Sequence, residues 1–262
     1  MNIRDIPLAG LGLFLMAGVA EASNEDLAKA AQNPVASMIS LPIQNNTTFN
    51  IGPDDRSQNV LNIQPVIPFS LSEDWNLITR TIIPVISQPA PGDSRTDGFG
   101  DTQFSAFLSP AKPGSLIWGV GPVAQLPTAT SDYLGNDTWG LGLSGVVLSM
   151  PGNWVIGALV NNVWGVGSHG NNDQNMMTFQ YFINYNFDGG WYVSSAPIIT
   201  ADWNKDSDER WVVPVGLGAG KVFKVGNQPM NAQVHAYYNV EKPDGWGDWQ
   251  LRLQIQWLFP KN

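Results

Sequence analysis

The sequence predicts an all-β fold, a transmembrane antiparallel up-and-down β-barrel of about 12 strands with a short N-terminal helix. Residues 249–259 are apolar at every odd position, while positions 250, 252, 254 and 256 carry Gln or Arg. Charged residues make up 13% of the chain, against about 25% in soluble domains. Many of the 11 Trp residues fall near the ends of predicted strands. A soluble β-sandwich also alternates, but the repetition of the pattern over barrel-length strands favours the barrel.

Residues 1–22 have the features of a secretory signal peptide. Arg4 precedes an apolar run from Leu8 to Ala20, and the small residues Ala20 and Ala22 suit cleavage by signal peptidase. A spanning helix needs about 20 apolar residues, so this run is too short to cross a bilayer. Because no later stretch has an uninterrupted apolar run of that length, a membrane-inserted chain must form a closed barrel.

Residues 23–34 are predicted to form a short helical segment. Ser23 or Asn24 can cap its start, and acidic residues follow in the first turn, where they favour the helix dipole. Pro34 ends the helix because the residue before a proline is pushed out of the helical region. This segment is a candidate plug for the barrel lumen.

The remaining chain, residues 35–262, is predicted to form the barrel. Short connections alternate with longer polar ones, as in outer-membrane barrels with short periplasmic turns and long extracellular loops. A spanning strand needs about 9 to 11 residues, whereas soluble strands usually have about 5 or 6. The predicted strands are long enough, and they cover residues 36–51, 58–71, 75–87, 99–110, 115–128, 139–150, 154–166, 175–187, 191–203, 210–224, 230–241 and 249–259.

Polar side chains that alternate with apolar ones are assigned to the lumen. Arg80 is assigned there because an arginine that faces lipid at mid-bilayer costs about 2 to 4 kcal/mol. The Gly- and Val-rich strands 139–150, 154–166 and 210–224 leave the facing open. The predicted lumen-lining residues are Asn62, Gln64, Arg80, Asp101, Gln103, Gln125, Gln180, Asn184, Asp202, Gln233, His235, Arg252, Gln254 and Gln256. These amides with few charges suit neutral or weakly polar solutes; alternatively, they hydrogen-bond across a closed interior.

Aromatic residues near the strand ends are assigned to the membrane interface. An indole ring is apolar with one polar N–H group, so it favours the boundary between lipid and water. The predicted interface aromatics are Trp75, Trp139, Trp154, Trp191, Trp203, Trp211, Trp249, Trp257 and Phe259. The alternative is that they belong to the core or rim of a soluble β-protein.

Several segments resemble one family of bacterial outer-membrane proteins. They are residues 45–50, 59–68 and 79–84, with residues 98–102 and 254–261 similar as well. That family is associated with the meta-cleavage pathway of phenol degradation, and its members are often labelled transporters or neuromedin U. The resemblance covers nearly the whole mature chain. It implies an outer-membrane barrel and the passage of small organic compounds, and it supplies no catalytic or binding residues.

The residues give little support for catalysis or metal binding. The chain has two His and no Cys, so a multi-histidine or thiolate metal site is not expected. The Asp-rich loops 171–173 and 202–208 lack the ordered spacing of a calcium loop, and solvated loop tips are the simpler interpretation. His235 with a strand serine is a conceivable hydrolase pair, but no paired motif supports it. We therefore expect no catalytic residue, no metal, no cofactor and no enzymatic activity.

The sequence thus predicts a protein of the Gram-negative outer membrane. We expect a channel or facilitator for passive passage of small, neutral or weakly polar organic molecules, aromatic ones included. The alternative is a closed structural or surface-interaction barrel without transport activity. Outer-membrane lipid, an unidentified small solute and the barrel assembly machinery, which would contact the C-terminal strand, are the expected partners. The net charge of −9 argues against nucleic acid.

Overall fold

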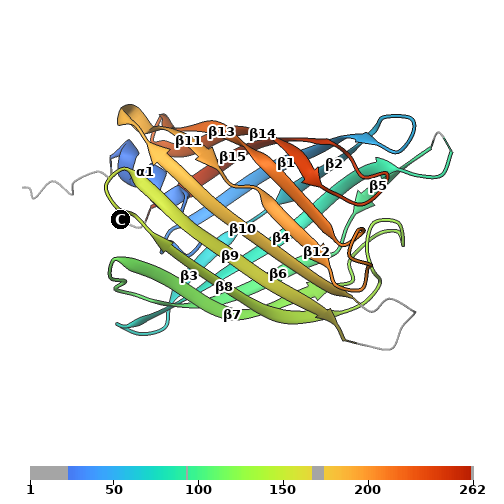
Figure 1. Ribbon diagram of the computed structural model, residues 1–262. Coiled ribbons are helices and arrows are strands. Elements are labelled where there is room, and N and C mark those ends of the chain that lie inside the picture. The colour runs from blue at the N-terminus through green and yellow to red at the C-terminus, as the bar shows by residue number, and fades with distance from the viewer. Residues whose placement is uncertain (1–22, 93, 167–173, 261–262) are drawn as a thin grey trace, which may run out of the picture.

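The computed structural model describes residues 23–92, 94–166 and 174–260, which form a closed β-barrel with a short helix at one end (Figure 1). The predicted signal peptide, residues 1–22, lies outside the described residues. The elements are α1 (Asn24–Ala31), β1 (Ile39–Ile51), β2 (Arg56–Ile63), β3 (Val66–Ser70), β4 (Trp75–Pro89), β5 (Arg95–Phe99), β6 (Thr102–Pro110), β7 (Leu116–Leu126), β8 (Gly140–Ser149), β9 (Trp154–Gly165), β10 (Asn175–Asn186), the 3-10 turn η1 (Asp188–Gly190), β11 (Trp191–Ser195), β12 (Ile198–Asp202), β13 (Trp211–Val225), β14 (Gln228–Glu241) and β15 (Trp249–Phe259).

The 15 strand segments make 12 barrel strands because three strands are each interrupted once. The interruptions lie between β2 and β3 at Pro65, between β5 and β6 at Asp101, and between β11 and β12 at Pro197. Pro65 and Pro197 have no N–H group to donate to the ladder, which fits an interruption of the strand pairing at these two positions.

Each barrel strand pairs antiparallel with its neighbours in sequence. The first and last strands, β1 and β15, pair from Ile39 opposite Phe259 to Phe49 opposite Trp249, and this pairing closes the sheet. The predicted all-β, up-and-down barrel of 12 strands with one short helix is confirmed. Among the residues that the structure describes, no helix is both long and apolar enough to cross a bilayer.

One predicted boundary is wrong. The sequence pattern places residues 95–98 in a loop, but β4 continues to Pro89 and β5 starts at Arg95, so the hairpin is longer and its loop shorter. Arg56 stabilises this loop from the neighbouring strand by donating from Nη1 to the carbonyl oxygen of Ala90 at 3.0 Å. Such a contact between distant parts of the sequence is not visible in local alternation.

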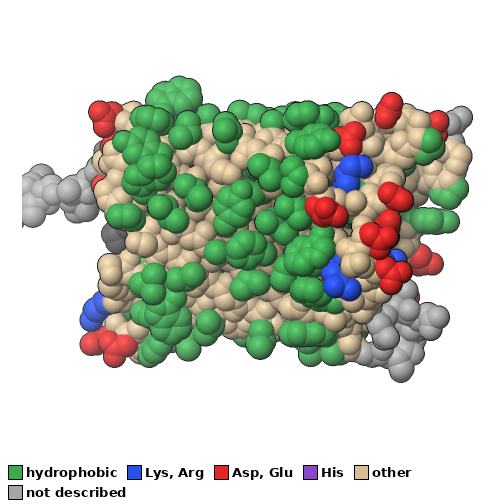
Figure 2. Space-filling view, in the orientation of Figure 1, with side chains coloured by type: hydrophobic (Ala, Val, Ile, Leu, Met, Phe, Trp, Pro, Cys, Tyr) green, Lys and Arg blue, Asp and Glu red, His purple; other side chains and the backbone are tan. Residues whose placement is uncertain are grey.

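The outer wall of the barrel is apolar. Apolar side chains cover the middle of the visible wall, whereas charged side chains gather toward its ends (Figure 2). Leu143 and Leu217 are 68% and 69% exposed, which is a large exposure for leucine side chains in the middle of strands. A continuous apolar surface of this kind fits contact with lipid, because an outer-membrane barrel carries an apolar band on its outside.

The interior has an apolar side and a polar side. The apolar side is a buried cluster on β4, β6, β8, β9 and β10, joined by one residue from the N-terminal segment; it consists of Ile78, Phe107, Val146, Leu148, Val155, Leu159, Phe182 and Val35. Opposite it, the inward residues of β14, β15 and β1 are mostly amides. The lumen is therefore partly filled by side chains, and the polar side borders the remaining space.

The helix α1 closes part of one end of the barrel, beside β11 in Figure 1. Ser23 caps it, since its Oγ accepts a hydrogen bond from the Asp26 N–H at 3.1 Å. Leu27 and Ala28 are buried against Leu258 and other side chains from β13 and the chain before β1. An eight-residue helix is too short to be stable alone in water, so this packing is what maintains it.

Candidate functional site in the barrel lumen

A cavity of about 200 Å³ lies inside the barrel. Polar inward side chains from β1, β10, β14 and β15 form one part of its wall, and apolar residues between Ala30 and Met38 form another. Ten of the fourteen residues that the sequence assigns to the lumen border this cavity: Asn62, Gln64, Arg80, Gln180, Asn184, Gln233, His235, Arg252, Gln254 and Gln256.

Strand register brings the polar residues of distant sequence segments together. In the pairing of β14 with β15, Gln233 lies opposite Gln254, and His235 lies opposite Arg252. Alternate residues of a strand point to the same face, so all four side chains point inward. The result is a continuous polar surface on neighbouring strands.

Two arginines border the cavity, and neutral groups hold both of them. Arg252 is 4% exposed; its Nε donates to Asn46 Oδ1 at 3.0 Å and its Nη1 donates to the carbonyl of Ala196 at 2.8 Å. The guanidinium of Arg252 also lies 5.1 Å from the centre of the Tyr237 ring, within the range of a cation–π interaction. Arg80 is half-buried and donates from Nη2 to Gln64 Oε1 at 2.6 Å.

The interrupted strand explains how Arg252 finds one of these partners. At Pro197 the strand between β11 and β12 leaves the ladder, so the carbonyl of Ala196 becomes free for side chains. It accepts from Arg252 and also from Gln180 Nε2, the latter at 3.2 Å. The break thus supplies a backbone acceptor inside the lumen.

His235 is buried in the same region. Its ring stacks on Tyr237 with the ring centres 5.7 Å apart and an interplanar angle of 6°. Its Nε2 lies 3.1 Å from Ser194 Oγ, and its Nδ1 has no hydrogen-bond partner among the described residues. Nucleophilic catalysis by such a pair needs a third group that orients the imidazole. Within the described part of the chain, this geometry does not complete a catalytic triad.

The N-terminal segment is held at the cavity by polar contacts as well as by burial. Gln32 Nε2 donates to Asn186 Oδ1 at 2.8 Å. Glu25 Oε1 accepts from the N–H of Gly189 in η1 at 2.7 Å. Hydrogen bonds from its own backbone N–H and then from Gly189 lower the pKa of Glu25 below its ordinary value. The segment is therefore docked at this end of the barrel by both apolar and polar groups.

No family model and no curated protein matches this chain. Solved structures do match it. The chain is similar to the COG4313 outer membrane channel from Pseudomonas putida F1, with a TM-score of 0.64 and 18% identity over 85% of this chain and 94% of that chain. It is also similar to the outer membrane phospholipase of Salmonella typhi, with a TM-score of 0.43 and 14% identity over 90% of this chain and 96% of that chain. The Pseudomonas putida toluene transporter TodX matches with a TM-score of 0.42 and 7% identity over 91% of this chain and 92% of that chain.

Of these three matches, the COG4313 channel has a TM-score above 0.5, and at 18% identity its likeness to this chain concerns the fold. Together with the closed sheet and the apolar outer wall, it decides the class and the location. This chain is a bacterial outer-membrane β-barrel. The lipid of the outer membrane surrounds the barrel. The association with phenol degradation and the contact with the barrel assembly machinery stay predictions.

The other four predicted lumen residues of this outer-membrane barrel do not border the cavity described above. Asp101, Gln103 and Gln125 border a second, more open cavity that residues 132–136 also line. Asp202 lies at the end of β12, where its Oδ1 accepts from the backbone of the following turn.

Asp101 acts as an anchor for a loop. Its Oδ1 accepts from the N–H of Ala129 at 3.1 Å, and its Oδ2 accepts from the N–H of Asn136 at 2.8 Å and from Gln125 Nε2 at 3.2 Å. The sequence interpretation, in which Asp101 starts an inward row of polar residues, missed this contact because the loop lies about 30 residues away along the chain.

The sequence interpretation also missed several polar groups at the cavity between Arg80 and Arg252. Gln44 and Ser194 border the cavity, and Asn46 binds Arg252. Alternation along β1 could have identified Gln44 and Asn46, since both lie on the inward face. Ser194 could not be assigned, because Ser fits either face of a strand.

The predicted interface aromatics lie on the outer face or at the rims. Most are more than a third exposed, whereas Trp211 and Trp257 are half-buried. Trp191 lies under Lys221, whose Nζ is 4.7 Å from the ring centre, close to η1. A lysine beside an aromatic at a strand end can reach water while its stem covers apolar surface. The interface role of these aromatics stays a prediction.

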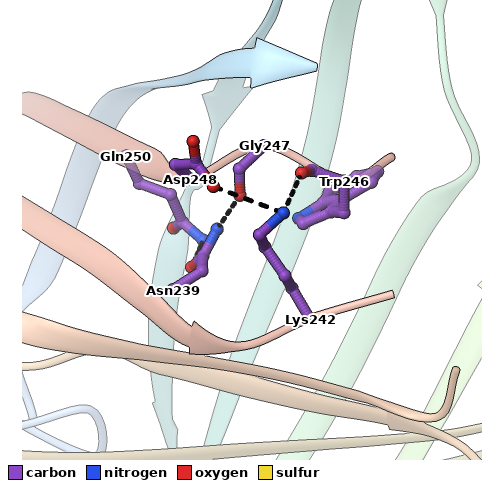
Figure 3. Close-up of polar contacts among 6 residues, drawn as sticks. All are labelled: Asn239, Lys242, Trp246, Gly247, Asp248 and Gln250. Atoms are coloured by element: carbon purple, nitrogen blue, oxygen red, sulfur yellow. Dashed lines mark hydrogen bonds and ion pairs between the residues drawn. The ribbon is translucent and has the colours of Figure 1, made fainter. Parts of the chain in front are cut away.

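The loop between β14 and β15, at the opposite end from α1, is held by a polar network (Figure 3). Asn239 is 2% exposed; its Nδ2 donates to the carbonyl of Gly247 at 2.6 Å, and its Oδ1 accepts from Gln250 Nε2 at 2.7 Å. Lys242 Nζ lies 3.3 Å from Asp248 Oδ1. In the described chain, no three His, Cys, Asp or Glu side chains come together as metal ligands.

Proposed function

We propose that this protein is a channel or facilitator that lets small organic molecules cross the outer membrane by passive diffusion. The proposed solutes are neutral or weakly polar, and they include aromatic compounds. The observation that carries the proposal is the lumen cavity, whose wall combines amides with apolar side chains. Such a wall can replace the water around both ends of an amphiphilic molecule.

The size of the cavity supports a small solute. It measures about 200 Å³, and an engineered cavity of about 150 Å³ in another protein binds benzene. A single aromatic ring therefore fits. Barrels of about eight strands leave room for side chains or one small ligand, and those of 16 or more leave an aqueous channel, so a narrow path suits 12 strands.

The N-terminal segment is the proposed gate. It borders the cavity at the end where α1 packs, and it is docked by a small set of contacts. Release of this segment would widen the path to the periplasm. Solutes would then move down their gradient without any energy source.

The filled interior supports a second candidate function. A cluster of eight buried apolar residues occupies one side of the lumen, as expected for a closed structural or surface-interaction barrel. In that case the cavity is an enclosed space and nothing passes through it.

Liposome swelling separates the two functions. Purified protein is reconstituted into liposomes, and swelling is measured with neutral solutes of graded size, including simple aromatic compounds. Heat-modifiable migration on gels verifies that the barrel is folded. Swelling with a size cutoff supports the channel, whereas its absence with folded, inserted protein supports the structural barrel.

A further inference from the structure

The charged side chains that border the lumen cavity are all positive. Arg80 and Arg252 are the arginines that border the cavity, and among the described residues no Asp or Glu borders it. Asp101 and Asp202, which the sequence assigned to the same lumen, lie elsewhere. Both side chains border the same cavity, Arg80 from β4 and Arg252 from β15. This part of the lumen therefore carries positive charge that the protein does not balance locally.

The hydrogen bonds of the two arginines leave most of their donors free. Each guanidinium has five N–H groups. Within the described chain, Arg80 makes one side-chain hydrogen bond and Arg252 makes two, all to neutral oxygens. Burying a charge without a counter-charge is costly, and an anion that pairs with it removes much of that cost. A bound anion is the simplest partner for these donors.

The remaining wall indicates what kind of anion fits. Ala30, Ala31, Pro34 and Met38 border the same cavity, as does Phe182 from β10. An inorganic anion would leave these apolar groups against water. An organic anion with an apolar body can cover them while its charge stays at the arginines. Arginine suits a carboxylate especially well, because its planar fork matches the two carboxylate oxygens.

We propose that the lumen contains a binding site for a small organic monocarboxylate, whose carboxylate pairs with Arg80 and Arg252 and whose apolar body packs against the N-terminal segment. The inference rests on the proposed function in that it names the class of solute favoured by the same lumen. It shifts the preference from neutral molecules toward the ionised form of weak organic acids. Binding can be measured without transport, so the two proposals can fail separately.

The test uses benzoate as the probe, because it has one carboxylate on one aromatic ring. Binding to the purified protein in detergent is measured by equilibrium dialysis, with benzyl alcohol as the neutral counterpart and chloride as the inorganic anion. We expect benzoate to bind at least about tenfold more tightly than benzyl alcohol, as a charged hydrogen-bonded pair provides. Equal concentrations of chloride should not displace it.

Variants identify the residues. Arg80→Gln and Arg252→Gln should each weaken benzoate binding by about tenfold or more. Arg95→Gln is the matched control, since Arg95 is exposed at the loop end and bonds only to Ser87 among the described residues; it should leave binding unchanged. Should Arg252→Gln not fold, Arg80→Gln carries the test, because Arg80 is half-buried and makes a single side-chain bond.

Three outcomes would overturn the site: equal affinity for benzoate and benzyl alcohol, unchanged binding in the folded lumen variants, or displacement of benzoate by an equal concentration of chloride. Swelling with neutral solutes in the absence of benzoate binding would refute the site and keep the channel. Benzoate binding that depends on Arg80, without swelling by any solute, would support the site and refute the channel.

Discussion

Leu27→Ala should release the N-terminal segment from the barrel. Leu27 is 3% exposed and packs with Met38, Val222 and Leu258 in one buried cluster. Removing a buried leucine side chain costs about 2 to 5 kcal/mol, since both the transfer energy and the packing are lost. A cost of about 3 kcal/mol would raise the population of the undocked segment about 100-fold.

The cost falls mainly on docking. The segment makes few other strong contacts, chiefly the bond from Gln32 to Asn186 and the bond from Gly189 to Glu25. The bond between Gln32 and Asn186 is worth about 0.5 to 1.5 kcal/mol, and the bond to Glu25 is exposed to water. The barrel itself is held by strand pairing that does not involve Leu27, so the barrel should stay closed.

Two assays measure the release. Trypsin should cleave after Lys29 faster in the variant, and liposomes that contain it should swell faster with small neutral solutes. Leu71→Ala is the control, since it makes the same chemical change at a leucine that is 57% exposed and lies outside the buried cluster. Heat-modifiable migration should be the same for both variants and the unmodified protein.

Either assay can refute the reasoning. Unchanged cleavage at Lys29 would mean that the burial of Leu27 does not maintain the docked segment. Faster cleavage with unchanged swelling would mean that the segment docks as described but does not limit passage. The second result would mean that the barrier to solute passage lies at the apolar cluster in the lumen or at the loops at the other end.

Three further predictions concern pH and the loops. The folded-state pKa of Glu25 lies below its ordinary value of 4.5. The contribution of Glu25 to docking is therefore present above pH 4.5 and is lost as the pH falls through the folded-state pKa. Liposome swelling should rise on acidification, and Glu25→Gln should abolish this pH dependence. Asp101→Ala removes two hydrogen bonds to the loop that it anchors and one to Gln125 of β7. Chymotrypsin should therefore cleave faster at Tyr133, which is 62% exposed, while the barrel remains heat-modifiable. Asn239→Ala leaves the buried carbonyl of Gly247 unpaired and should lower the free energy of unfolding by about 1 to 3 kcal/mol, measured by heat-induced loss of the folded band. Asp248→Asn is the comparison: it should change this free energy by less than about 1 kcal/mol, because the ion pair between Lys242 and Asp248 is partly exposed.

Much of the fold could be predicted from the sequence because lipid imposes a simple rule on each strand. Outward positions must be apolar and inward positions can be polar, so a strand such as β15 shows its two faces directly. The interruption at Pro65 and that at Pro197 were harder to predict. Both prolines are visible in the sequence, but local alternation continues on either side of them, and only strand pairing shows where the ladder is broken.

The polar half of the lumen could be predicted, and the apolar half could not. Polar residues on alternating strands must avoid lipid, which assigns residues such as Gln233 and Arg252 to the interior. Apolar residues fit both the lipid-facing and the lumen-facing side of a strand. In β8 and β9, Val146 and Val155 point into the buried cluster, while Val147 and Ile156 face outward, and nothing in the residue types distinguishes the two sets.

The three interrupted strands and the polar contacts of the lumen are connected. Gln64, which binds Arg80, precedes Pro65; Ala196, whose carbonyl binds Arg252, precedes Pro197. At the third interruption, Asp101 binds the loop. Where a residue leaves the ladder, it loses a backbone hydrogen bond, and its polar groups can then point into the lumen. β-Bulges near functional sites have the same effect. If the arginines serve binding, straightening the strand with Pro197→Ala should weaken benzoate binding without removing any charge. Unchanged binding would mean that Ala196 only completes the hydrogen bonds of a closed interior.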